Sequence, residues 1–437
     1  MKSAVRKGSR RPTDVLCCTI LVSLLLSSPP RASAGWAELR PGSTLGQENW
    51  QEAKGLLPEA VLRRFEDGGY ESKIAALPSP PEWGHQFTSA SSKNAGKFSI
   101  DTADSLIANA TKSYPELLYG YPFPQIDPQD DQAAAKVIYN FSYAMMQGGD
   151  VERFSTLHWV SPLSHEDQVE FRGGLLFLGS RASSPLPNPQ GILRKGIIQG
   201  LSPDAVKGTV IIEETYLDPK RWNSLWAYVP EFRRMRQLPA SKGSDNLFGS
   251  DLAHDDLYVF SGKVQYFTWK LLGVQHALVP FTLPHPKTLS RSEHGYVLET
   301  PSDPLVMGWQ KEGWKGKAWW PTNCELVRRP VWVIEATAKD SKYEYARQVL
   351  WIDKETYVAF YKEAYNRSGK LWRTLTSAVS VARTRDGEVS VAQPDFILSV
   401  DEFDDSATVE LPGKPGQPIT FGTVPSSERF TPENLSE

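Results

Sequence analysis

The residue types best suited to chemistry gather between residues 208 and 270. This stretch combines guanidinium, carboxylate and aromatic side chains, namely Arg234, Arg236, Asp251, Asp255, Asp256, Trp226, Tyr228 and Trp269. Guanidinium groups bind carboxylates and phosphates through paired hydrogen bonds, and aromatic rings line apolar cavities. We therefore predict a ligand-binding site at these eight residues, in which the arginines hold an anionic group and the rings hold an apolar body.

The arginines of this stretch have two interpretations. Arg234 and Arg236 share one face of a strand because side chains alternate along it, and Arg233 takes the other face. A buried guanidinium without a partner is costly, so an inward-facing pair needs the acidic residues at 251–256 as partners. Either these charges form a structural network that joins the acidic loop to the sheet, or they form a cationic rim for an anionic headgroup.

Motifs for catalysis and metal binding are weak in this chain. His254 precedes two aspartates, but none of the seven histidines has the HxxxH or HExxH spacing that places two metal ligands together. The serines of the same loop lack the GxSxG pattern of a nucleophile elbow. These patterns predict no catalytic residue, no metal and no cofactor, and they favour a binding protein over an enzyme.

The first 34 residues predict export. Basic residues up to Arg11 are followed by the 12-residue apolar run Val15–Leu26 and by the small residues Ala32–Ala34. This order is typical of a secretory signal peptide, and the run is too short for a membrane-spanning helix of about 20 residues. We predict cleavage after Ala34. Only Cys324 then remains, which indicates the bacterial periplasm because eukaryotic secreted proteins of this size usually carry several disulfides.

The charge balance argues against a nucleic-acid partner. Residues 1–34 carry six basic residues and one acidic residue, so the rest of the chain has a net charge of −8 when the whole has −3. Proteins that bind nucleic acid neutralise phosphates with lysine and arginine. The chain also has 14 Trp, 16 Tyr and 18 Phe, ring types that are common in strands and in apolar cavities.

Local sequence patterns predict two helices and a long β region. Apolar spacing predicts a helix at 48–65, and acidic residues at the start with two glycines at the end predict another at 129–146. A shorter helix is expected at 101–110 and a Pro/Ser-rich connector at 77–96. Alternating runs predict a meander of antiparallel strands, at 209–217, 225–228, 331–337, 343–352, 357–365 and 370–381. The predicted organisation is a signal peptide (1–34), a helical and extended segment (35–150), a β domain (151–402) and a polar tail (403–437).

Several motifs in a fixed order resemble a known family. They are Gly55-Leu-Leu-Pro-Glu-Ala-Val-Leu, Tyr121-Pro-Phe-Pro, Arg233-Arg-Met-Arg, Arg328-Arg-Pro-Val-Trp and Trp351-Ile-Asp. Over residues 45–400 the chain resembles bacterial exported proteins whose domain has no known function. That family is considered similar in fold to the periplasmic lipoprotein carrier LolA.

The resemblance implies a mainly β fold with some helix. The expected architecture is a large curved antiparallel sheet, or incomplete barrel, whose concave face is covered by helices. Related folds hold acyl chains there, which implies a periplasmic carrier or accessory protein for a lipid or a lipidated protein. Its partner is expected to be an envelope transporter or an outer-membrane protein. A scaffold or envelope-stress sensor that binds proteins is the alternative, and a hydrolase that uses the acidic loop is the third reading.

Overall fold

The computed structural model describes residues 39–422 except 116, 147–148, 180–185, 240–242, 283–284, 300–303 and 415. The chain from Gly35 onward forms one compact unit. The predicted signal peptide lies outside the described residues. Among the described residues, no helix is both long enough and apolar enough to cross a membrane.

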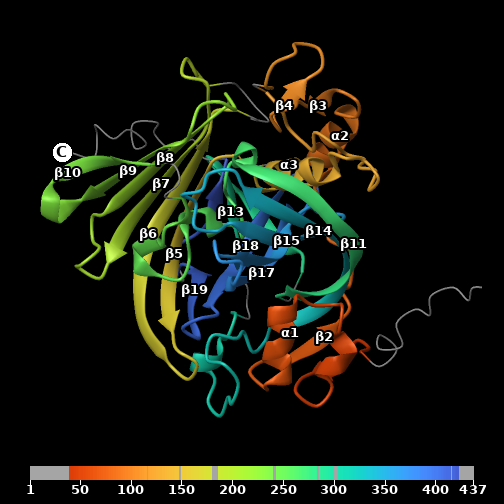
Figure 1. Ribbon diagram of the computed structural model, residues 1–437, viewed down its shortest axis with the longest axis vertical. Coiled ribbons are helices and arrows are strands. Elements are labelled where there is room, and N and C mark those ends of the chain that lie inside the picture. The colour runs from red at the N-terminus through yellow and green to blue at the C-terminus, as the bar shows by residue number, and fades with distance from the viewer. Residues whose placement is uncertain are drawn as a thin grey trace, which may run out of the picture. The chain divides into compact units, whose positions relative to one another are not determined.

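A long curved sheet is the framework of the molecule (Figure 1). Thirteen antiparallel strands follow one another across it, in the order β10 (Arg234–Leu238), β9 (Ser224–Val229), β8 (Val210–Tyr216), β7 (Ile192–Ser202), β6 (His165–Phe177), β5 (Val151–Val160), β19 (Ser406–Pro412), β18 (Ser390–Asp401), β17 (Leu371–Thr384), β16 (Ala359–Tyr365), β15 (Arg347–Asp353), β14 (Glu325–Ala338) and β11 (Phe267–Phe281). The pairings of the described residues do not join β10 to β11, so the sheet is not a closed barrel. The predicted mainly β fold with an open curved sheet is confirmed.

Short strands extend this sheet at its margins. They are β1 (Thr44–Leu45), β2 (Ser72–Ala75), β12 (Lys287–Ser292), β13 (Gly295–Leu298) and β20 (Thr420–Phe421). Two of them pair in parallel, β2 with β14 and β12 with β17, so the sheet is mixed and not purely antiparallel. The N-terminal segment therefore contributes strands to the same sheet as the β region.

The helices differ from the prediction at three places. Residues 48–65 form a 3-10 turn at Trp50–Ala53 and a separate helix α1 (Glu59–Glu66), because Gly55 has φ +76° and Pro58 directly precedes the helix. The expected connector contains α2 (His85–Lys93). The expected short helix at 101–110 is instead the hairpin β3 (Phe98–Ile100) and β4 (Leu106–Ala108). The helix α3 (Ala133–Met146) confirms the prediction at 129–146.

The predicted strands agree with the structure in type and nearly in extent, but the predicted polar tail is wrong in its first part. Residues 406–412 form β19, which lies between β18 and β5 near the middle of the sheet. The run is short, and its two buried apolar residues Ala407 and Val409 give little periodic signal. Its burial comes from strands that lie far away in the sequence.

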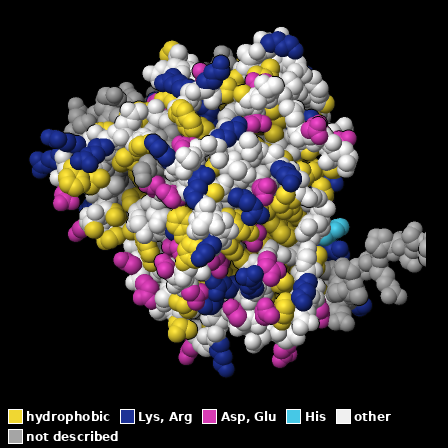
Figure 2. Space-filling model, viewed as in Figure 1, with side chains coloured by type: hydrophobic (Ala, Val, Ile, Leu, Met, Phe, Trp, Pro, Cys, Tyr) yellow, Lys and Arg dark blue, Asp and Glu magenta, His cyan; other side chains and the backbone are white. Residues whose placement is uncertain are grey.

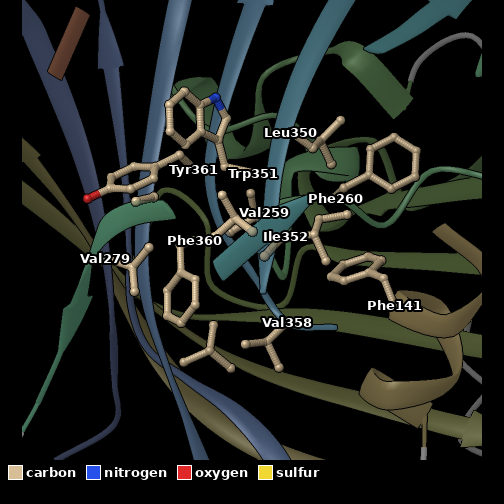
Figure 3. Packing of buried hydrophobic residues seen from close by; sticks show 14 of the residues in the cluster. Phe141, Val259, Phe260, Val279, Leu350, Trp351, Ile352, Val358, Phe360 and Tyr361 are labelled. Carbon is tan, nitrogen blue, oxygen red and sulfur yellow. The ribbon is translucent and has the colours of Figure 1, made fainter. Parts of the chain in front are cut away.

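The hollow of the sheet is filled by the segment that connects β10 to β11. We call residues 243–266 the cover loop. Its Leu247 and Leu252 pack with Leu157 and Phe171 of the sheet. Figure 3 shows Val259 and Phe260 of the cover loop together with Phe141 of α3 in the main core. The concave face is therefore covered mostly by a loop, with α3 packed against β11, β14 and β18 beside it.

Candidate functional site

The cavity wall

A cavity lies between the cover loop and the strands β5 to β8. The strand pairings place Arg153 opposite Gly173, and Gly196 opposite Glu213. Together with Glu410 of β19, these side chains line about 670 Å³ of space free of protein atoms, its mouth included. The remaining wall is mainly apolar, with Phe171, Leu175, Ile198, Ile211 and Leu257 among its residues.

Glycines in the middle of two strands make room for this cavity. A Cβ atom on Gly196 would lie 3.5 Å from Leu175 Cδ2, and one on Gly173 would lie 3.7 Å from Arg153 Cγ, both ordinary contact distances. Neither glycine is needed for a positive φ angle. Glycine weakens a strand and often marks a place that a ligand or another backbone approaches. These positions are therefore tolerant of a side chain that would fill the cavity.

A second cavity continues the first toward α3. It has about 750 Å³ of space free of protein atoms, its mouth included, and is lined by α3 residues such as Phe141 and Met145 together with β6 to β8. Leu175, Arg194 and Tyr258 border both cavities. The two cavities are therefore adjacent and share part of their walls beneath the cover loop and α3.

The cover loop is strained where it borders the cavity. Tyr258 and Val259 have φ angles of +58° and +73°. This conformation is rare for residues other than glycine and is unfavourable for a β-branched residue such as valine. It is maintained because Val259 and Phe260 are buried in the core, where they are 0% and 2% exposed (Figure 3). Tyr258 is thereby left on the cavity wall.

The polar groups of the cavity

Charged groups at one side of the cavity form a buried pair. Arg153 Nη2 lies 2.6 Å from Glu410 Oε1, and Arg153 Nε donates a hydrogen bond to Ser155 Oγ at 2.9 Å. Both charged side chains are less than a tenth exposed. Burial raises the pKa of Tyr258, the Arg153 charge lowers it and the Glu410 charge raises it again, so the phenol stays neutral near pH 7.

A second polar group lies at the other side of the cavity, around His254. The side-chain atoms of Glu213, His254 and Asp255 that could bind a metal ion lie within 4.8 Å of one another. These are donor types that zinc accepts, but the Arg194 guanidinium lies 3.8 Å from Glu213 and competes with a cation for it. The pKa of His254 is raised: burial lowers it, and its contact with Asp255 and the charge of Glu213 more than offset that effect. His254 Nδ1 is 3.6 Å from Asp255, an ion-pair distance and not a hydrogen bond.

The predicted residues in the structure

The three predicted aspartates hold the cover loop in place. Asp251 pairs with Arg373 at 3.2 Å, and Asp255 accepts a hydrogen bond from the Tyr343 hydroxyl at 2.8 Å. Asp256 forms an ion pair with Lys362, and both of these side chains are fully buried. The charges therefore join the loop to the sheet, but their partners are not the predicted arginines.

Arg234 and Arg236 do not reach the cavity. They lie on β10, the last strand at one edge of the sheet, and both are exposed. Figure 2 shows Lys and Arg side chains that gather at this end of the molecule. The Arg236 guanidinium lies 5.5 Å from the centre of the exposed Phe232 ring. The pairing of β10 with β9 confirms that the two arginines share a strand face. The predicted network is corrected, because Asp251 and Asp256 pair with Arg373 and Lys362 instead. Arg233 belongs to the turn, at φ +46°.

The predicted rings also lie outside the cavity. Ile211 and Glu213 of the wall pair with Ala227 and Leu225, so Trp226 and Tyr228 point to the opposite face of the sheet. There they pack on a separate cluster around Ile212. Trp269 is half-buried against Phe260 and Phe267 and donates its indole N–H to the Val264 carbonyl at 2.9 Å. The eight predicted residues therefore lie in four separate places and do not form one site.

Sequence reasoning missed the residues that do line the cavity. These are Arg153, Gly173, Gly174, Arg194, Gly196, Glu213, Tyr258 and Glu410. A signal was present in Arg172-Gly-Gly-Leu and Arg194-Lys-Gly-Ile, where glycine interrupts strand-like runs beside a charged residue. Strand-internal glycines of this kind indicate a close approach to the backbone.

Similarity to known proteins

The chain belongs to the family described as proteins of unknown function, DUF1329, whose model matches residues 44–436. This confirms the resemblance seen in the sequence. An uncharacterised protein of Pseudomonas aeruginosa, PA3922, is 24% identical over 260 residues, which cover 58% of this chain and 51% of that protein. The match thus spans about half the length of this curated relative.

Solved structures of similar fold come from three bacteria. A putative outer membrane lipoprotein-sorting protein domain from Vibrio parahaemolyticus is 16% identical, with a TM-score of 0.48 over 71% of this chain and 100% of that chain. A DUF1329 family protein from Desulfovibrio piger ATCC 29098 is 16% identical, with a TM-score of 0.45 over 68% of this chain and 97% of the other. The LolA superfamily protein NE2245 from Nitrosomonas europaea is 14% identical, with a TM-score of 0.41 over 69% and 98%.

Proposed function

We propose that the protein is a periplasmic carrier that holds an apolar ligand, such as a lipid or a lipid-modified protein's acyl chain, in the cavity beneath the cover loop. The single observation that carries the proposal is this pair of adjacent, mainly apolar cavities, the first of which is bordered by Gly173 and Gly196, which have no side chain to fill it. Small-molecule sites are typically concave, mostly apolar and supplied with a few convergent polar groups. The cavity has each of these properties.

The energetics are adequate for a carrier. An alkyl tail that buries about 400 Å² gains about 10 kcal/mol at roughly 25 cal/mol per Å². Association costs of about 4 kcal/mol or more leave about 6 kcal/mol or less, which corresponds to a Kd of roughly tens of micromolar or weaker. A carrier needs such intermediate affinity, because it must release its ligand to an acceptor.

The cover loop is the element we expect to move when a ligand enters. Tyr258, one of its two strained residues, borders both cavities, and α3 residues line the second one. Strained backbone conformations persist only where the surrounding packing maintains them. A tail that displaces this packing would widen the two narrow cavities into one.

The test is to fill the cavity without disturbing the fold. We expect Gly196→Leu to weaken binding of a fluorescent long-chain acyl probe at least tenfold, since the side chain occupies the space that the tail would use. The free energy of unfolding should change by less than about 1 kcal/mol, because glycine is unfavourable inside a strand.

Gly273→Leu is the matched control, since Gly273 lies on β11 with nothing within 4 Å of its Cβ position. It should leave probe binding unchanged. Equal binding by the wild type, Gly196→Leu and Gly273→Leu would contradict the proposed cavity, as would a wild-type protein that binds no acyl probe.

A further inference from the structure

The cavity contains a carboxylate oxygen that is only half satisfied. Glu410 lies on β19, its side chain is 1% exposed, and it lines the cavity. Its Oε1 receives the Arg153 guanidinium at 2.6 Å. Its Oε2 has no hydrogen-bond partner among the described residues. Buried polar atoms are nearly always paired, so an unpaired acceptor on a cavity wall indicates a donor that comes from outside the chain.

The position of this oxygen is set by its surroundings and not by a free rotation of the side chain. Arg153 is anchored by its second bond, to Ser155 Oγ at 2.9 Å, and holds one carboxylate oxygen. β19 is paired on both sides, with Glu410 opposite Ile397 of β18 and Leu157 of β5. The acceptor is therefore preorganised at a fixed place in an apolar wall.

The rest of the lining offers a complementary donor. Arg194 donates through Nη2 to the Ser261 carbonyl at 2.6 Å, but its Nε–H also has no partner among the described residues. Its charge is balanced by Glu213, which lies 3.8 Å away, as the charge of Arg153 is balanced by Glu410. These four side chains together bring no net charge, and they leave one free acceptor on Glu410 and one free donor on Arg194. His254 Nδ1, which also lies on the wall, has no hydrogen-bond partner among the described residues either.

We infer that the ligand is a neutral apolar alcohol, a long-chain or polycyclic molecule whose hydroxyl group donates a hydrogen bond to Glu410 Oε2. This inference rests on the proposed carrier function and names the class of its ligand. A hydroxyl group is both a donor and an acceptor, which matches the free acceptor of Glu410 and the free donor of Arg194.

Charged head groups fit this cavity less well. A carboxylate would place acceptor oxygens against Glu410 Oε2, with no proton between them. An ammonium group would satisfy Glu410 but add a net charge to an apolar space in which the charges of Arg153 and Arg194 are already balanced. Direct hydrogen bonds to a charged group are among the stronger ones, so a single hydroxyl can decide between ligands of equal tail length.

The experiment compares four ligands with the same sixteen-carbon tail. Hexadecanol, its methyl ether, palmitate and hexadecylamine each compete with a fluorescent acyl probe for the full exported protein at pH 7.5. We expect hexadecanol to bind about tenfold or more tightly than the ether, which lacks the donor, since a hydrogen bond to a charged group has about this effect. Palmitate and hexadecylamine should also bind more weakly than hexadecanol.

Glu410→Gln tests the oxygen directly. Its amide oxygen can keep the Arg153 contact while its NH₂ faces the cavity, so the preference for alcohol over ether should fall to about one. Glu335→Gln is the matched control, because Glu335 pairs with Arg347 at 2.7 Å and lines neither cavity, and its preference should stay as in the wild type. If Glu410→Gln does not fold, the four wild-type affinities alone decide.

The outcomes separate this inference from the proposed function. Equal affinity for the alcohol and its ether would overturn the alcohol inference but not the proposed carrier function. A preference for palmitate or for hexadecylamine would have the same consequence. Failure of all four ligands to displace or replace the probe, or failure of the probe to bind, overturns the carrier function itself.

Discussion

His285 is held in its neutral form by its surroundings. It is 4% exposed, stacks edge-on against Phe281 at 5.2 Å, and neither ring nitrogen has a hydrogen-bond partner among the described residues. Burial lowers its pKa to about 4; nearby Asp395 opposes this, and Lys287 adds to it. A histidine in the unfolded chain has a pKa near 6.5, so the unfolded state binds a proton that the folded state excludes.

The expected consequence is a loss of stability in mild acid. The contribution of His285 is complete above about pH 6.5 and is lost as the pH falls toward 4, because protonation then favours the unfolded chain. We predict that the wild type loses about 2 to 3 kcal/mol more than His285→Phe between pH 7.5 and pH 4.5, measured by urea unfolding. Other titrating groups are present in both proteins and cancel.

His294→Phe is the control, since this side chain is 77% exposed. It should follow the pH dependence of the wild type. Parallel curves for the wild type and His285→Phe would show that the buried ring does not govern the acid sensitivity.

At the scale of elements, the cover loop depends on one buried charge pair. Asp256 contacts Lys362 of β16, and it also accepts hydrogen bonds from the Tyr345 hydroxyl at 2.9 Å and the Ala253 amide at 2.8 Å. Removal of one member of such a pair leaves an uncompensated charge in the interior, whereas removal of both is much less costly. The pair therefore couples the loop to the sheet.

We predict that Lys362→Met lowers the free energy of unfolding by about 3 to 5 kcal/mol. The double variant Lys362→Met with Asp256→Asn should recover most of this loss. Because the loop covers the cavity, the single variant should also bind the acyl probe more weakly. Chemical denaturation and probe titration measure both effects.

An exposed pair supplies the comparison. Glu59 and Arg63 lie 3.5 Å apart on α1 with about two thirds of each side chain exposed, so Glu59→Gln should change the stability by less than about 1 kcal/mol. A similarly small effect of Lys362→Met would mean that the buried pair does not anchor the loop.

At the scale of the whole molecule, the carrier proposal requires export. The chain from Gly35 onward is one compact unit, and its first described residues already belong to it: Leu39 is fully buried. We predict that the mature protein begins at Gly35 in the periplasmic fraction, because signal peptidase recognises small residues such as Ala32 and Ala34. N-terminal sequencing of the exported protein tests this, and a mature protein that retains residues 1–34 would contradict it.

The edge strand β10 lies away from the cavity. β10 presents Arg234 and Arg236 to solvent, and charged side chains on an edge strand discourage pairing with other chains. We propose that these two arginines bind an anionic surface of a docking partner and do not contact the ligand in the cavity. Their replacement should accordingly leave the affinity for the sixteen-carbon ligands unchanged.

Local pattern was sufficient for most of the β architecture. Alternation of apolar residues identified the strands around 209–217 and 331–381 because one face of each is buried, and that period is a property of neighbouring residues. The helix at 129–146 was also predicted from a local pattern of neighbouring residues. Gly55 and Pro58 are helix-breaking residues, but the apolar stripe on both sides of them led to the prediction of one continuous helix.

The site was decided by tertiary structure. Asp251 and Asp256 were assigned to arginines 15 to 22 positions away, whereas their partners Arg373 and Lys362 lie more than 100 positions further along the chain. Which face of β9 borders the cavity depends on the curvature of the sheet and on which loop fills its hollow, and neither is encoded within one strand. The sequence by itself determined the strands and their alternating faces; only the folded sheet, by joining β5 to β19, placed Arg153 against Glu410 at the cavity wall.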